Sequence, residues 1–186
     1  MSNDNHTAVK EAFPELAEIE DEDLRTGVIE AWARALEASG DTDLDAVPWF
    51  PPEERRLDIK SETLVAHVRD VTAGALALCD ILRDRRNAAV SRDLVAAGAL
   101  CHDVSKLYEF EDGESTEIET LLGHPHYGVH AVAVAGLPVE IMHIALSHSG
   151  RTAVEPAFIE AEIVRRADEV AAAAIRSTAV DDLRTI

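Results

Sequence analysis

Apolar residues recur at steps of three and four along most of this chain, which is the spacing of one face of a helix. Between residues 61 and 83 the apolar positions are Leu64, Val68, Val71, Ala75, Leu78 and Leu82. Such a stripe is typical of an amphipathic helix that buries one side. No run alternates between apolar and polar residues, as a half-buried strand would. The sequence therefore predicts an all-α fold without strands.

The same spacing, together with helix start and stop signals, predicts the other helices. Gly40 is a suitable C-terminal stop, Ser61 a suitable N-cap, and Pro125 sits where a helix start tolerates proline. The predicted helices span residues 8–19, 22–38, 61–83, 92–104, 117–122, 124 to the break at 136–138, 139–147 and 156–178. The last eight residues are expected to fray.

Residues 41–60 are predicted to form a loop, because three prolines interrupt them. Trp49 and Phe50 lie in this loop and have two interpretations, a cap on the core or a lid over a site, of which the cap is favoured. Residues 1–60 are expected to be N-terminal helices and a Pro-rich loop packed on a core domain of residues 61–186.

The charge of the chain restricts its partners. The formal net charge is −19 over 186 residues, which argues against duplex nucleic acid and against anionic membrane surfaces. No apolar run is long enough to span a membrane, and the first ten residues lack a signal-peptide core, so a cytoplasmic location is expected. The acidic, lysine-poor composition fits either a salt-adapted source or an arginine-biased genome. Two cysteines provide no disulfide framework.

The pair His102-Asp103 carries the clearest chemical signal. It ends an apolar stretch that begins at Ala96, and Lys106 follows three residues later. An adjacent imidazole and carboxylate have no obvious packing role, but together they suit a metal ion. Asp168 supports this interpretation, because its helical neighbours one and two turns away are all apolar. A buried ion pair with an Arg or His of another helix is the structural alternative for Asp168. Those apolar neighbours are Ala161, Val164, Ala171 and Ile175.

The remaining histidines divide into two sets. His67, His124 and His148 are spaced widely around the His-Asp pair and complete an ordered series with Asp168. His148 follows a buried segment, a common place for a side chain aimed into a cleft. The other four are given structural or surface roles: His6, His126, His130 and His143.

On these residues the chain resembles the HD-domain superfamily of metal-dependent phosphohydrolases. His67, His102-Asp103 and Asp168 match its H…HD…D motif, and the two further histidines match those of its binuclear members. The segment from His124 to Gly128 is similar to the HPxxG segment of the HD-GYP group, and the segment from His102 to Lys106 is similar to its HDxxK. The resemblance covers about residues 61–175.

The resemblance implies an HD-domain helical bundle with two divalent transition-metal ions, Mn, Fe, Ni or Zn. His67, His102, Asp103 and Asp168 would hold one ion, and Asp103 would bridge to a second ion held by His124 and His148. Two such ions, about 3.5–4 Å apart, activate a water for hydrolysis of a phosphate mono- or diester. Lys106 and Arg151 would bind the phosphate of a small-molecule substrate.

Two departures limit the resemblance. No Gly-Tyr-Pro follows His148, so hydrolysis of cyclic di-GMP is not implied. Thr63 stands where three-metal relatives have a glutamate, which favours two metals. A diiron oxygenase acting on a small molecule and a non-catalytic metal-binding domain remain alternatives, since imidazole and carboxylate suit redox-active iron as well as other metals. The sequence is compatible with a homodimer.

Overall fold

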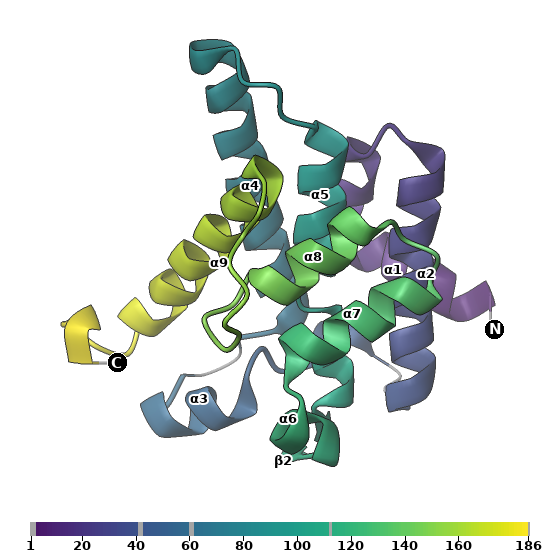
Figure 1. Ribbon diagram of the computed structural model, residues 1–186. Coiled ribbons are helices and arrows are strands. Elements are labelled where there is room, and N and C mark those ends of the chain that lie inside the picture. Colours follow the sequence, from purple (N-terminus) through teal and green to yellow (C-terminus); the bar gives the residue numbers. More distant parts are fainter. Residues whose placement is uncertain (1–2, 41–42, 60–61, 112, 186) are drawn as a thin grey trace.

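The computed structural model describes residues 3–40, 43–59, 62–111 and 113–185. Figure 1 shows a bundle of helices. This part of the chain also contains one short pair of strands. The strands β1 (Phe110–Glu111) and β2 (Glu114–Ser115) pair antiparallel. The all-α prediction is confirmed, although the predicted absence of any strand is wrong, because two-residue strands are too short to show alternation. The α-helices are α1 (Asn3–Ala12), α2 (Glu22–Ser39), α3 (Pro51–Leu57), α4 (Leu64–Arg86), α5 (Arg92–Cys101), α6 (Glu117–Leu121), α7 (His124–Val134), α8 (Val139–Ser147) and α9 (Ile159–Ser177).

The predicted helix over residues 8–19 is wrong in its extent. Helix α1 ends at Ala12, and Pro14 begins a separate 3-10 turn that runs to Glu18. Proline cannot donate the helical hydrogen bond, and it pushes the preceding residue out of helical geometry. Phe13 accordingly adopts φ −122° and ψ 78°. The helix break follows directly from Pro14.

The predicted loop at 41–60 contains a helix of its own. Its prolines start α3 at Pro51 rather than preventing a helix, because the first helical turn has no hydrogen bond for a proline to remove. Ser61, the predicted N-cap of the next helix, lies outside the described residues. Thr63 caps α4 instead, since its side chain accepts a hydrogen bond from the backbone N–H of Ala66.

The hydrophobic core lies where α4, α5 and α9 pack together, with α8 across α5 and α9. Helices α1 and α2 join the core from the opposite side, and α7 packs on α8 and α2 (Figure 1). Trp32 of α2 is fully buried and donates its indole N–H to the carbonyl of Leu100 at 2.8 Å. Core side chains thus come from segments before and after residue 60 in the sequence. The domain boundary at residue 60 stays a prediction.

No helix in the described part of the chain is both long enough and apolar enough to cross a membrane.

Candidate metal centre

Side chains from five helices meet at the centre of the bundle. Each lies in α4, α5, α7, α8 or α9, or directly after one of them. Asp168 keeps 17% of its side chain exposed, and the others are buried. The structure therefore brings together all six residues that the sequence suggested as ligands. They are His67, His102, Asp103, His124, His148 and Asp168.

A helix break between His102 and Asp103 lets both side chains reach this centre. Helix α5 ends at Cys101, not at residue 104 as predicted, and Asp103 leaves helical geometry with φ −111° and ψ 10°. In a continuous helix the two side chains would point about 100° apart. Here His102 Nε2 lies 3.4 Å from Asp103 Oδ2. The chain then turns into a 3-10 helix, Val104–Tyr108.

The six side chains form two groups that are each compact enough for one ion. His67 Nε2 lies 3.1 Å from Asp168 Oδ1 and 3.4 Å from His102 Nε2. In the second group, His124 and His148 lie beside Asp103. Within each group the ligand atoms all lie within 4.8 Å of one another. Either group could therefore hold a metal ion.

Asp103 lies between the two groups and presents one oxygen to each. Its Oδ1 is 3.4 Å from His124 Nε2 and 3.5 Å from His148 Nε2. Its Oδ2 is 3.4 Å from His67 Nε2 and 3.4 Å from His102 Nε2. A carboxylate in this position is the arrangement expected of a bridging ligand.

Two of the histidines are oriented by backbone carbonyls. His102 Nδ1 donates to the carbonyl of Ala99 at 2.6 Å, and His148 Nδ1 donates to that of Ala145 at 2.8 Å. Because a carbonyl can only accept, the ring proton is assigned to Nδ1 in both. Nε2 then directs its lone pair toward the centre, which is the form that binds a metal.

The pKa shifts also suit metal binding. Burial alone would raise the pKa of Asp103, but the charge of Lys106, together with the imidazoles beside it, holds it well below its usual value. Burial opposes ionisation of Asp168 too, yet its hydrogen bond with His67 and the neighbouring imidazoles lower its pKa to about 2. Burial lowers the pKa of His124. The centre therefore offers ionised carboxylates and a neutral imidazole, the states in which these groups bind metals.

The pKa of His67 moves in the other direction. Burial would lower it, but hydrogen bonds with Asp103 and Asp168 raise it overall. A cation bound there would replace the proton as the partner of these carboxylates.

The donor set fits a divalent transition metal. Asp103 Oδ1 is buried and has no hydrogen-bond partner among the described residues. A buried carboxylate oxygen without a donor is costly, and a metal ion would satisfy it. Imidazole nitrogen with carboxylate oxygen suits zinc, iron, manganese and nickel alike.

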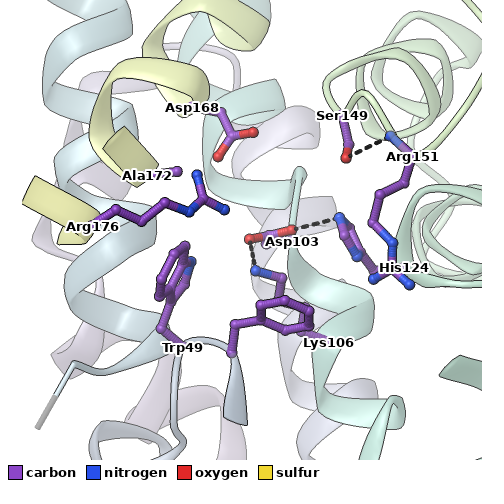
Figure 2. A pocket seen from close by; sticks show the side chains of 10 residues that line it. Trp49, Asp103, Lys106, His124, Ser149, Arg151, Asp168, Ala172 and Arg176 are labelled. Atoms are coloured by element: carbon purple, nitrogen blue, oxygen red, sulfur yellow. Dashed lines mark hydrogen bonds and ion pairs between the residues drawn. The ribbon is translucent and has the colours of Figure 1, made fainter. Parts of the chain in front are cut away.

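A pocket opens over this centre. Its volume is about 130 Å³, and Asp103, Asp168 and His124 form part of its wall. Figure 2 shows Lys106 and Arg151, the two predicted phosphate-binding residues, facing it from different sides. Lys106 is 8% exposed, and its Nζ lies 2.8 Å from Asp103 Oδ2. Lys106 and Arg151 thus share one cavity with three of the candidate ligands.

Glu109 belongs to this centre and was not predicted from the sequence. It is fully buried, with Oε2 3.4 Å from His124 Nδ1 and Oε1 3.9 Å from Arg151 Nη1. A carboxylate behind a ligating histidine fixes the ring and increases its basicity. One sequence signal could have identified Glu109. It follows Lys106 by three residues, as Lys106 follows Asp103, and residues three apart align on a 3-10 helix.

Replacing Glu109 by glutamine is expected to weaken metal binding at the Asp103, His124 and His148 group by about 10–100-fold. The amide cannot balance the charge that a metal-bound imidazole acquires. Metal titration of the apoprotein by calorimetry measures the effect. Glu119→Gln is the matched control, since Glu119 also pairs with Arg151, at 2.8 Å, but forms no ion pair with a histidine in the described part of the chain. Equal metal affinities in both variants would contradict the assignment of Glu109 to the metal centre.

The remaining histidines of the central helices lie away from this site, as predicted. His126 and His130 are exposed on α7. His143 Nε2 accepts a hydrogen bond from the backbone N–H of Ala157 at 2.9 Å, and its ring packs on Phe158. His143 therefore holds the segment that leads into α9.

Comparison with known proteins agrees with this geometry. The sequence model of the HD-domain family matches residues 64–173, which include all six candidate ligands. The chain belongs to the HD-domain family. A relative of this HD-domain chain is the dihydroneopterin 2',3'-cyclic phosphate phosphodiesterase of Methanocaldococcus jannaschii, 36% identical over 111 residues. The match covers 57% of this chain and 45% of the relative, so this chain corresponds to about half of that protein. No solved structure matches.

Proposed function

We propose that this HD-domain chain is a metal-dependent phosphohydrolase that cleaves phosphodiesters. The observation that carries the proposal is Asp103, whose two oxygens face two sets of histidines beneath a pocket that Lys106 also lines. The name of the Methanocaldococcus relative describes a cyclic phosphate phosphodiesterase, which supports this substrate class. Small cyclic phosphate esters are therefore the first substrates to test.

The proposed cofactor is a pair of divalent transition-metal ions. His67, His102, Asp103 and Asp168 would hold one ion, while Asp103, His124 and His148 would hold the other. When bound, such ions supply an acidified water and stabilise charge on the phosphate oxygens.

The proposed role of Lys106 and Arg151 is to bind and orient the phosphate. The Lys106 ammonium has three donors, and its contact with Asp103 Oδ2 uses one of them. Arg151 is held by Glu119 at 2.8 Å, and its guanidinium group lies over the Phe50 ring. A guanidinium group can pair with two phosphate oxygens at once. Both cations would hold the ester against the centre and offset its negative charge.

A hydrolysis screen tests the function. The metal-loaded wild-type protein should cleave bis(p-nitrophenyl) phosphate or a 2',3'-cyclic nucleotide, and chelation should abolish the activity. Lys106→Ala should keep its metals and lose about 10²–10³ in turnover, since one donor to the developing charge is missing. Lys10→Ala, an exposed lysine of α1, serves as the control. If the protein cleaved no phosphate ester and showed an iron charge-transfer band, the result would contradict the hydrolase proposal and favour the diiron oxygenase.

A further inference from the structure

One wall of the pocket is built by residues outside the HD-domain match. Trp49 and Phe50 precede the matched residues 64–173, and Arg176 follows them. Trp49 packs with Ala172 and Ile175 of α9 in a small apolar cluster separate from the main core. The favoured interpretation of Trp49 and Phe50, a cap on the core, is therefore incomplete, because both side chains also line the pocket.

Arg176 is held in place on this wall. Its Nε donates to Glu53 Oε1 at 3.0 Å, and its guanidinium carbon lies 5.5 Å from the centre of the Trp49 ring. Figure 2 shows the guanidinium group extending from α9 into the pocket above Trp49, on the side of Asp168 and Asp103. Its two Nη groups form no hydrogen bond with the described residues. Arg176 thus presents free donors to the cavity.

Trp49 contributes a second donor without a partner. The residue is 3% exposed, and its indole Nε1 is buried with no hydrogen-bond partner in the described part of the chain. Buried polar groups are nearly always paired, and the indole N–H can only donate. Its missing partner must therefore be an acceptor.

Lys106 connects this wall to the metal centre. Its Nζ lies 5.4 Å from the centre of the Trp49 ring, so Lys106 and Arg176 both approach the same indole. No ion pair joins Arg176 to Asp103 or Asp168 among the described residues, so it does not serve as their counterion. Free guanidinium and indole donors beside an ammonium group make a site for an oxyanion.

We propose that Arg176 and the indole N–H of Trp49 bind oxygens of the substrate phosphate that Lys106 also contacts. The inference rests on the proposed phosphohydrolase function and adds two substrate-binding residues to it. It also means that segments outside the HD-domain match take part in substrate recognition. The ligand class is a phosphate oxyanion, and inorganic phosphate is its simplest probe.

Calorimetric titration of the metal-loaded protein with inorganic phosphate tests the proposal. Arg176→Met keeps an apolar stem against Trp49 but removes the charge, and Glu53 keeps its other partner, Arg56, at 2.7 Å. The phosphate Kd and the KM for the best ester should rise at least about tenfold, with a smaller change in kcat. Trp49→Phe, which keeps a ring but loses the N–H, should shift the Kd in the same direction.

Arg166→Ala is the matched control, because this exposed arginine of α9 pairs with Glu162 and Glu169 away from the pocket. Unchanged phosphate Kd and KM in Arg176→Met would overturn the inference while leaving the hydrolase proposal intact. Failure of the wild-type protein to cleave any phosphate ester would instead overturn the proposed function. The phosphate titration would still report on Arg176 in that case.

Discussion

Asp103→Ala is expected to lose most of both metal ions and to reduce hydrolysis to the level of the chelated wild-type protein. The reason is its position, since Oδ1 lies 3.4 Å from His124 Nε2 and Oδ2 lies 3.4 Å from His67 Nε2. No other described carboxylate contacts both groups. Elemental analysis after gel filtration measures the metal content per chain.

The alanine variant also removes the partner of a buried lysine. Lys106 Nζ lies 2.8 Å from Asp103 Oδ2, and an orphaned buried charge costs about 3–5 kcal/mol of stability. Asp103→Asn keeps an acceptor oxygen for Lys106 and should still lose the metals. Asp84→Asn, an exposed aspartate of α4, is the control. Full occupancy of both ions in a folded Asp103→Asn protein would contradict the bridging assignment.

Asp168→Asn is expected to abolish activity, to weaken metal binding and to remove most of the stabilisation that metal ions give the wild-type protein. In the metal-free protein the asparagine oxygen can still accept a hydrogen bond from His67 Nε2, which lies 3.1 Å from Asp168 Oδ1. With metal present at a hundredfold excess over its Kd, the wild-type protein should gain about 2.7 kcal/mol by mass action, and the variant should not.

Thermal melts of both proteins, in chelator and in excess metal, measure this difference. A structural ion pair would give another result, because removing one charge of a buried pair destabilises by about 3–5 kcal/mol with or without metal. No Arg or Lys pairs with Asp168 in the described residues, so a structural ion pair could involve only the imidazoles of His67 and His102. A variant that gained the full wild-type stabilisation from added metal would therefore contradict the ligand assignment.

The helices were largely predictable because their signals are local. The stripe from Leu64 to Leu82, the stop at Gly40 and the start at His124-Pro125 all correspond to observed helix positions. The errors lie at positions where the backbone conformation depends on more than the spacing of apolar residues. Pro14 divided one predicted helix, and Pro51 started another inside a predicted loop. Proline has opposite effects inside a helix and at its first turn, and only the position of the helix start distinguishes them.

The sequence by itself determined the candidate ligands, because residue type and order limit the metal chemistry they support. It also determined that Asp168 lies on an apolar helix face, which periodicity reveals. It did not point to Arg176, it favoured a cap on the core for Trp49, and it placed Glu109 three residues after Lys106 without showing that this side chain meets His124. Trp49 and Arg176 reach the site across packed segments, so no spacing along the chain links them to it.

Only the tertiary structure decided which oxygen of Asp103 faces which histidines, because that depends on the break after α5 and on the packing of α4, α7 and α8 around it. It likewise decided that Arg176 of α9 lies against Trp49 from the segment before α3. Local sequence patterns set helix limits through hydrogen bonding and side-chain periodicity. Contacts between segments follow from how the buried faces fit together, and no single segment of the sequence contains that information.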